Sequence, residues 1–290
     1  MTWTVLAAAC LLLPLQAAPP QVPWPAPSAP ARLAALEARA GGRLGVAVLD
    51  TGSGRRLDHR GGERFPLCST FKVLLAGAVL ARVDGGQEAL NRRVPYGQAD
   101  LLDYAPVTTA HVAEGGLGVG DLCAAAVEVS DNTAANLLLQ TLGGPEAITT
   151  FARTLGDPVT RLDRTEPTLN TALPGDPRDT TTPSAMVDTL RVLLLGDALS
   201  PASRQRLEGW MVACTTGRNR LRAGLPADWA AGDKTGSGER GTVNDVAILR
   251  PPHRAPLLVA VYYTGSTASM DHRNAVLAEV GRILVSVFKE

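Results

Sequence analysis

The sequence that decides the fold is Phe65-Pro66-Leu67-Cys68-Ser69-Thr70-Phe71-Lys72, followed by the apolar segment VLLAGAVLA at positions 73–81. This segment is apolar on every side, which predicts a fully buried helix. Ser69 would lie at or near the first turn, with Lys72 three residues further along the same face. We therefore expect a hydroxyl and an amine side by side at the positive end of a helix, where burial can lower a lysine pKa. The Ser-x-x-Lys spacing is weak evidence alone, because an ordinary helix start with a solvated lysine also produces it.

The composition points away from polymer ligands. The chain has 290 residues, of which 45% are hydrophobic, enough for one large domain or two small ones. It carries 28 basic and 28 acidic residues, so its formal net charge is zero. No cluster of Lys and Arg marks a nucleic-acid footprint, so we expect small-molecule substrates and no nucleic acid.

The first 31 residues contain no charged side chain. Within them, positions 5–15 form an apolar run that is too short to span a bilayer, which needs about 20 residues. A Pro- and Ala-rich stretch follows. Although a basic start is missing, this order indicates a signal peptide and lead-in over residues 1–30, and no stable membrane span. We expect an exported protein, periplasmic or secreted.

Four cysteines occur in the chain, at Cys10, Cys68, Cys123 and Cys214. Removal of a leader would leave three, so at least one would be unpaired. A Cys68–Cys214 bridge remains an open alternative. No cysteine or histidine spacing resembles a zinc site, and we expect neither a metal nor a cofactor.

The order of predicted elements indicates a sheet made from both ends of the chain. The predicted strands are 44–49, 55–59, 229–237, 242–249 and 257–263. The predicted helices are 31–40, about 69–81, 121–127, 133–142, 145–156, 183–195, 201–213 and 271–288, and residues 84–118 are expected to be mostly loop. This pattern predicts an α/β (α+β sandwich) fold, a five-stranded antiparallel sheet flanked by helices with an inserted all-α domain. The α/β part would be 31–62 and 214–290, and the helical part 63–213.

A long segment without periodicity, residues 157–182, contains four prolines together with acidic and basic side chains. A structureless loop of this length inside a compact domain is usually functional. Its mixed charges predict that internal ion pairs hold it closed.

Four further pieces of sequence carry chemistry: Ser130-Asp131-Asn132, Glu166-Pro167-Thr168-Leu169-Asn170, Arg220 and Lys234-Thr235-Gly236. Each has an ordinary interpretation: a helix cap, an acidic loop, a surface arginine and the end of a solvent-facing strand. Together with Ser69-x-x-Lys72, in this order and at these spacings, they resemble the class A serine β-lactamases. The resemblance covers nearly the whole chain from about Arg32.

The resemblance implies a complete set of site residues. The catalytic residues would be Ser69, Lys72, Ser130, Glu166, Asn170 and Ser237, and the substrate-binding residues Tyr104, Asn132, Arg220, Lys234, Thr235 and Gly236. Ser69 would attack the lactam carbonyl and form an acyl-enzyme. The base for this step stays open between Lys72 and Glu166, the latter acting through a water. Ser130 would pass a proton to the departing lactam nitrogen.

The same resemblance assigns the binding groups. Backbone N–H groups of Ser69 and Ser237 would form the oxyanion hole. The cationic and hydroxyl groups of Lys234, Thr235, Ser237 and Arg220 would meet the substrate carboxylate. Asn132 would hold the acylamino side chain, and Tyr104 would wall the cleft.

Glu166 and Asn170 distinguish turnover from mere acylation, because a carboxylate and an amide four residues apart can hold and deprotonate a water. The implied function is therefore hydrolysis of penicillins and cephalosporins, which confers resistance to β-lactam antibiotics, by a monomer. The rivals are a penicillin-binding peptidase and a β-lactam sensor that acylates and stops. The resemblance also implies a cis Glu166–Pro167 bond and an Arg164–Asp179 ion pair. Because Gly238 stands where carbapenem-hydrolysing members have a cysteine, strong carbapenem hydrolysis is not implied.

Overall fold

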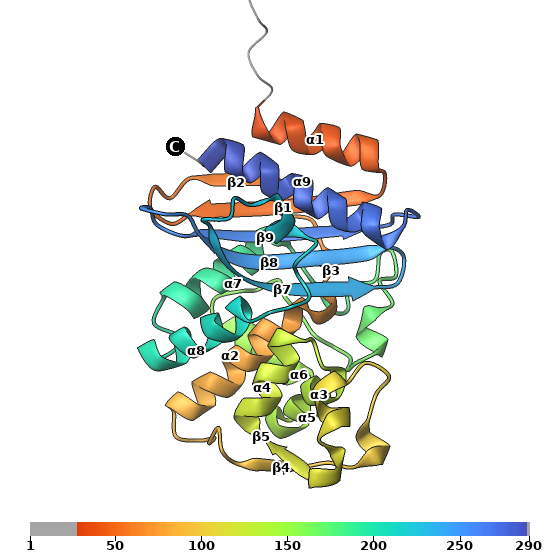
Figure 1. Ribbon diagram of the computed structural model, residues 1–290, viewed down its shortest axis with the longest axis vertical. Coiled ribbons are helices and arrows are strands. Elements are labelled where there is room, and N and C mark those ends of the chain that lie inside the picture. Colours follow the sequence, from red (N-terminus) through yellow and green to blue (C-terminus); the bar gives the residue numbers. More distant parts are fainter. Residues whose placement is uncertain (1–27, 289–290) are drawn as a thin grey trace, which may run out of the picture.

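A five-stranded antiparallel sheet joins the two ends of the chain (Figure 1). The computed structural model describes residues 28–288. The strand order is β2-β1-β9-β8-β7. The strands are β1 Arg43–Asp50, β2 Arg56–His59, β7 Ala230–Gly238, β8 Thr242–Arg250 and β9 Leu257–Thr264. Strand β1 pairs with β9 along its whole length, with Val46 opposite Val261, so the N-terminal and C-terminal strands form one sheet. The predicted sheet and its strand limits are confirmed within two residues.

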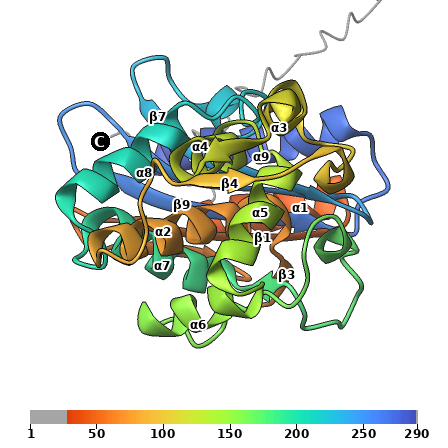
Figure 2. The same ribbon diagram turned by 90° about the horizontal axis from the view of Figure 1, so that it is seen from below.

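Two helices, α1 (Ala29–Ala40) and α9 (Met270–Phe288), cover one face of the sheet (Figure 1). Leu33 and Leu36 of α1 pack with the apolar side of α9 and with the sheet residues that point to this face. The opposite face carries the helical body, which Figure 2 shows from its own side. The sheet is therefore buried on both faces, which explains why β9 is almost continuously apolar in sequence.

Helix α2 (Phe71–Asp84) runs through the centre of the helical body. Its first ten residues, 71–80, are all buried, as the all-round apolar sequence predicts. Gly77 allows a close approach, since a Cβ there would lie 3.1 Å from Leu193. The other helices are α3 Pro106–Ala110, α4 Val119–Glu128, α5 Asn132–Leu142, α6 Glu146–Thr154, α7 Pro183–Leu195 and α8 Pro201–Val212. The predicted helix 183–195 matches α7 residue for residue.

Two local details refine the predictions. Residues 84–118 are largely loop and turn, as predicted, but they also contain α3 and two short paired strands, β4 (Arg93–Pro95) and β5 (Gly116–Gly118), which were not predicted. These pieces are too short to give a periodic pattern. Ser69 lies near the first turn of the long helix, as predicted, but just outside it. It occupies a 3₁₀ turn, Cys68–Thr70, that leads into α2.

A pair of short strands lies at the long loop. Strand β3 (Phe65–Pro66), just before Ser69, pairs with strand β6 (Thr180–Thr181), which lies at the end of the loop. The further 3₁₀ turns are Gln98–Asp100, Val112–Glu114, Thr168–Asn170 and Leu221–Gly224. No helix within residues 28–288 is long and apolar enough to cross a membrane. The predicted signal peptide lies almost entirely outside the described residues.

Candidate active site

Ser69 is held where the end of the sheet meets the helical body. The turn that bears it is fixed from both sides: Thr70 Oγ1 donates to Leu67 O at 2.7 Å, and Asn244 Nδ2 on β8 donates to Pro66 O at 2.8 Å. Cys68 has φ 44°, in the left-handed region, which turns the chain sharply into α2. Ser69 is 8% exposed, and its Oγ donates to Glu166 Oε1 at 3.0 Å. The hydroxyl thus faces a carboxylate that can accept its proton.

Lys72 is completely buried at the same point. Its Nζ lies 3.0 Å from Glu166 Oε1, and it donates to Asn132 Oδ1 at 2.7 Å and to Ser130 O at 2.9 Å. Burial lowers the pKa of Lys72, and the negative charge of Glu166 opposes that shift. The expected meeting of hydroxyl and amine therefore occurs, with Glu166 Oε1 as their shared partner.

Glu166 is placed by two asparagines. The Asn136 side chain bonds the Glu166 backbone twice, accepting from its N at 3.0 Å and donating to its O at 2.9 Å. Asn170 Nδ2 donates to Glu166 Oε2 at 2.5 Å. Asn170 Oδ1 is buried and has no hydrogen-bond partner among the described residues. The Glu166–Pro167 bond is cis, as the resemblance implied.

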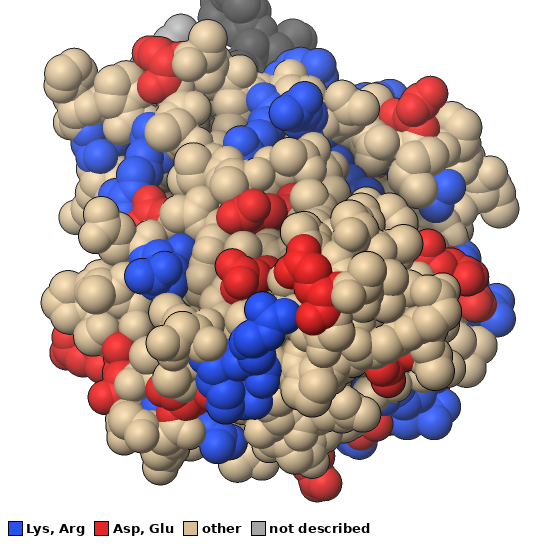
Figure 3. Space-filling view, turned by 60° about the horizontal axis from the view of Figure 1, so that its bottom comes forward, with Lys and Arg blue, Asp and Glu red and all other residues tan. Residues whose placement is uncertain are grey.

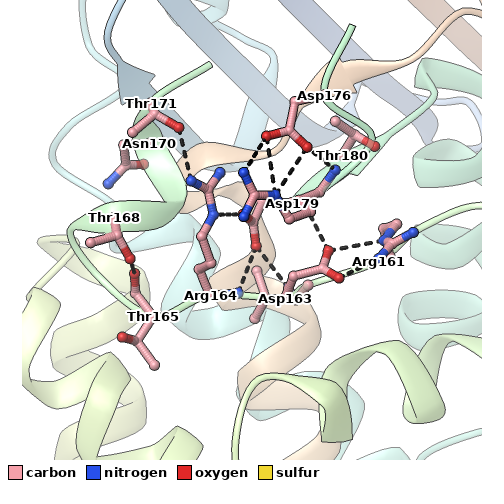
Figure 4. Close-up of polar contacts among 12 residues, drawn as sticks. Arg161, Asp163, Arg164, Thr165, Thr168, Asn170, Thr171, Asp176, Asp179 and Thr180 are labelled. Carbon is pink, nitrogen blue, oxygen red and sulfur yellow. Dashed lines mark hydrogen bonds and ion pairs between the residues drawn. The ribbon is translucent and has the colours of Figure 1, made fainter. Parts of the chain in front are cut away.

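Ion pairs close the loop that carries Glu166 (Figure 4). Asp179 Oδ2 accepts from Arg164 Nε at 2.5 Å, and Asp179 Oδ1 accepts from the backbone N–H groups of Asp163 and Arg164. Asp179 is 1% exposed, so it is a buried carboxylate whose charge is fully met. The predicted clamp is confirmed, and it fixes both ends of the segment that presents Glu166 and Asn170.

Ser130 lies between two lysines. Its Oγ accepts from Lys234 Nζ at 3.0 Å and from Lys72 Nζ at 3.3 Å. Lys234 belongs to β7 and is completely buried. Burial first, and then the charge of Lys72, lower the pKa of Lys234 to about 7. A hydroxyl between two amines is suited to receive and pass on a proton.

Arg220 reaches the cleft from behind the β7 strand. Its Nη1 donates to Gly236 O and to Asn244 O, each at 2.7 Å, while Nη2 donates to Ser237 Oγ at 2.6 Å. Thr235 Oγ1 lies 2.6 Å from Thr216 Oγ1. This edge therefore presents hydroxyls that are backed by a buried guanidinium, a combination that suits a carboxylate ligand.

These groups surround one cleft of about 310 Å³. Its lining residues are Ser69, Tyr104, Ser130, Asn132, Asn170, Thr216, Arg220, Thr235 and Ser237. The four other predicted site residues, Lys72, Glu166, Lys234 and Gly236, contact these lining residues from behind. Tyr104 is 52% exposed, and its backbone O accepts from the N–H of Asn132 at 2.9 Å. The structure thus brings all the predicted site residues together.

Sequence reasoning missed several residues that hold the site. Thr216 lines the cleft, Asn136 fixes the Glu166 backbone, and Asn244 bonds the turn before Ser69. Asn136 follows Ser130-Asp131-Asn132 closely, so its place one helical turn after Asn132 could have suggested it. Nothing in the sequence near Thr216 or Asn244 indicates their roles.

No bridge forms between the cysteines of the described chain. Cys68, Cys123 and Cys214 are all free and buried, and burial raises the pKa of each thiol. Cys68 packs closely against Gly238: a Cβ at position 238 would lie 2.7 Å from Cys68 Sγ, so a larger residue there would clash. Within residues 28–288, no group of three or more His, Cys, Asp or Glu side chains is placed to hold a metal ion.

The charged side chains on the helical side are mixed in sign. Lys and Arg groups lie beside Asp and Glu groups rather than in a field of one sign (Figure 3). A mixed surface does not favour a polyanionic partner. The chemistry of the site itself is that of acyl transfer: a nucleophilic hydroxyl, an adjacent carboxylate, a second hydroxyl between two amines, and a carboxylate-binding edge.

Known proteins similar to this chain agree with that chemistry. The model of the beta-lactamase enzyme family matches residues 29–288. Beta-lactamase AST-1 of Nocardia asteroides is 51% identical over 254 residues, 88% of this chain and 82% of that protein. Beta-lactamase CTX-M-8 of Citrobacter amalonaticus is 49% identical over 253 residues, 87% of each. An ancestral class A beta-lactamase structure superposes with a TM-score of 0.89 at 65% identity, covering 90% of this chain and 100% of that one.

Proposed function

The chain belongs to the beta-lactamase enzyme family and is a class A serine β-lactamase, and from this premise we propose which residues carry out its hydrolysis of penicillins and cephalosporins. Opening the β-lactam ring destroys the antibiotic, so the activity confers resistance. The observation that carries the proposal is the pair of 3.0 Å contacts that join Ser69 Oγ and Lys72 Nζ to one oxygen, Glu166 Oε1.

Ser69 Oγ attacks the lactam carbonyl carbon, and its proton goes to Glu166. The support is the direct hydrogen bond from Ser69 to this carboxylate. Lys72 is the second candidate base, because burial lowers its pKa toward the neutral form. In the described geometry its Nζ instead donates to Asn132 and to the backbone O of Ser130. The backbone N–H groups of Ser69 and Ser237 stabilise the oxyanion that forms.

Collapse of the tetrahedral intermediate breaks the bond between the carbonyl carbon and the lactam nitrogen. Ser130 Oγ gives its proton to that nitrogen and regains one from Lys72, which lies 3.3 Å away. Lys72 in turn regains a proton from Glu166 Oε1, 3.0 Å away, which leaves Glu166 ionised for the next step. Lys234, 3.0 Å from the same Oγ, favours the transient negative charge on Ser130. The products of this step are the ring-opened amine and the ester on Ser69.

The carboxylate of the substrate binds to Ser237, Thr235 and Thr216, with the positive charges of Lys234 and Arg220 behind them. Arg220 contributes chiefly through Ser237, whose Oγ its Nη2 contacts. Asn132 donates its side-chain N–H to the acylamino group, since its Oδ1 is taken by Lys72. Tyr104 forms the open wall of the cleft.

Deacylation uses Glu166 and Asn170. A water between Glu166 and the Asn170 side chain loses a proton to the carboxylate and attacks the ester carbonyl. The bond to Ser69 then breaks, and Glu166 returns the proton to Ser69 Oγ, 3.0 Å away, which restores both groups. The buried and unpartnered Asn170 Oδ1 supplies an acceptor for the second hydrogen of that water. This step separates the enzyme from a penicillin-binding protein or sensor.

The part of the proposal that concerns the leader is independent of the chemistry. We propose that residues 1–30 direct export to the periplasm or the medium. Residues 31–290 form the catalytic unit, in which 31–62 and 214–290 make the α/β part and 63–213 the helical part. This unit is a monomer. The uncharged start of the chain and the family it belongs to support the export. The pairing of β1 with β9 supports a unit whose sheet part comes from both ends of the chain. Intact-mass measurement of the secreted protein, with light scattering for its molar mass, tests it.

The catalytic proposal is tested by burst kinetics with a chromogenic cephalosporin. The parent should turn over continuously, whereas Glu166→Gln should slow acylation and release at most one equivalent of product in a burst. Asp188→Asn, which changes an exposed carboxylate paired with Arg56 far from the cleft, serves as a matched control and should behave as the parent. A stoichiometric burst without turnover in the parent would instead indicate a penicillin-binding or sensor protein.

A further inference from the structure

A second cavity, of about 680 Å³, lies between the later half of the 157–182 loop and one end of the sheet. Its size is within the range of small-molecule sites, roughly 300–1,000 Å³. Loop residues 172–177 form one wall, and the start of β1, the end of β9 and the turn after β7 form the other. None of its lining residues lines the catalytic cleft. It is therefore a separate site.

The two acidic side chains of this second cavity already have partners. Glu63 pairs with Arg43 at 3.0 Å, and Asp176 pairs with Arg178 at 2.7 Å. Their charges are met by these guanidinium groups, so neither carboxylate is left to hold a cation. The cavity does not suit a positively charged ligand.

Two arginines that line the second cavity have no carboxylate partner. Arg64 Nη1 donates only to neutral acceptors, Val159 O at 3.0 Å and Thr180 Oγ1 at 2.9 Å. The side chain of Arg240 makes no hydrogen bond or ion pair with any residue in 28–288. Guanidinium groups bind carboxylate and sulfonate oxygens with two parallel hydrogen bonds. These arginines give the cavity an unmet positive charge.

The remaining surface of the second cavity is largely apolar. Pro66, Ala172, Leu173, Pro174 and Pro177 line it. The Leu173 side chain is 40% exposed. Contact with a ligand would remove this apolar surface from water, which is favourable. An inorganic anion would leave that surface exposed.

We propose that the second cavity binds a small organic anion with one carboxylate or sulfonate group and an apolar aromatic body. The anionic group lies at Arg64 and Arg240, and the body lies against Leu173 and the prolines. The occupant would rest on the loop that also presents Asn170. Asn170 O accepts from the N–H of Glu239 at 2.9 Å, so the two walls meet next to the catalytic residues.

The test uses two fluorescent probes with the same aromatic body, 8-anilinonaphthalene-1-sulfonate and its uncharged parent N-phenyl-1-naphthylamine. Titration of the purified protein should show tighter binding of the sulfonate. Arg240→Gln should weaken sulfonate binding about five- to tenfold and leave the neutral probe unchanged, since only the charge contact is lost. Arg206→Gln, an exposed arginine of α8, is the matched control and should change neither.

A second variant tests the apolar wall. Leu173→Asp should weaken binding of both probes, because it removes apolar contact and adds a negative charge. Amide chemical-shift changes on sulfonate binding should gather at residues 172–177, 240 and 264–265. The proposal is overturned if the sulfonate fails to bind, if Arg240→Gln leaves its affinity unchanged or weakens both probes equally, if Arg206→Gln has the same effect, or if the shifts centre on Ser69 and Ser237.

Discussion

Lys234 Nζ lies 3.0 Å from Ser130 Oγ, so the lysine that we assign to the substrate carboxylate also contacts the hydroxyl that we assign to the lactam nitrogen. In the mechanism that we propose, one buried ammonium group therefore serves both substrate binding and proton transfer. Its pKa is lowered to about 7, chiefly by burial and then by the charge of Lys72. Several properties of the enzyme should follow from this contact.

The first prediction is a fall in kcat/KM above neutral pH. Lys234 loses its charge as the pH rises through about 7, which removes a cation that favours the substrate carboxylate. The profile of kcat/KM reports the free enzyme, so it should decline with an apparent pKa near 7. In Lys234→Arg the guanidinium stays charged, and the decline should move beyond pH 9. Identical alkaline limbs in both proteins would contradict the assignment.

The second prediction concerns stability. The unfolded chain binds a proton at Lys234 up to about pH 10.4, whereas the folded chain loses it near pH 7. Between these values the unfolded state binds more protons, so this group makes stability rise with pH and costs most below pH 7. Lys234→Met should therefore raise Tm at pH 6 by about 2–4 °C while it lowers activity.

Calorimetry at several pH values measures the effect of Lys234→Met. The gain in Tm should shrink from pH 6 toward pH 10, because the cost of burying the charge disappears as the lysine becomes neutral. A variant that is less stable than the parent at every pH would show that the contacts of Lys234 outweigh its desolvation.

The third prediction concerns the loop clamp. Asp179→Asn removes the carboxylate that pairs with Arg164 and leaves the guanidinium of Arg164 partly buried without a counter-charge. The free energy of unfolding should therefore fall by about 3 kcal/mol. The loop should then be cut faster by protease between residues 163 and 179, and the substrate range should change. Urea unfolding and limited proteolysis measure these effects. Asp176→Asn in the same loop, whose partner Arg178 is exposed, should change little; equal effects of the two variants would contradict the clamp.

The fourth prediction concerns Asn136, which bonds the N–H and O of Glu166. Asn136→Ala should lower stability by about 1–3 kcal/mol, because it leaves backbone groups without partners. It should also slow deacylation more than acylation, since Glu166 would no longer be held against Asn170. Stopped-flow measurement with a chromogenic cephalosporin should show a larger burst followed by slower turnover. A loss of stability with unchanged partitioning between the two steps would limit Asn136 to a structural role.

The sequence by itself determined the local elements and the set of residues that form the site. Helix 183–195, the buried helix after Ser69 and the positions of the sheet strands follow from apolar periodicity, proline positions and turn residues, which act over a few residues. Motifs in a fixed order named Ser69, Lys72, Ser130 and Lys234 in advance. The short pieces within 84–118 were missed, because elements of three to five residues are too brief for a periodic pattern.

Only the tertiary structure decided which groups touch. Ser69 faces Glu166, 97 residues away, because the loop ion pairs and Asn136 bring that carboxylate over α2. Arg220 donates to Ser237 Oγ, 17 residues away, and Lys234 is buried rather than solvent-facing and donates to Ser130 Oγ, 104 residues away. Such contacts and the pKa shifts they cause depend on burial and on partners far apart in the chain, which no local pattern encodes.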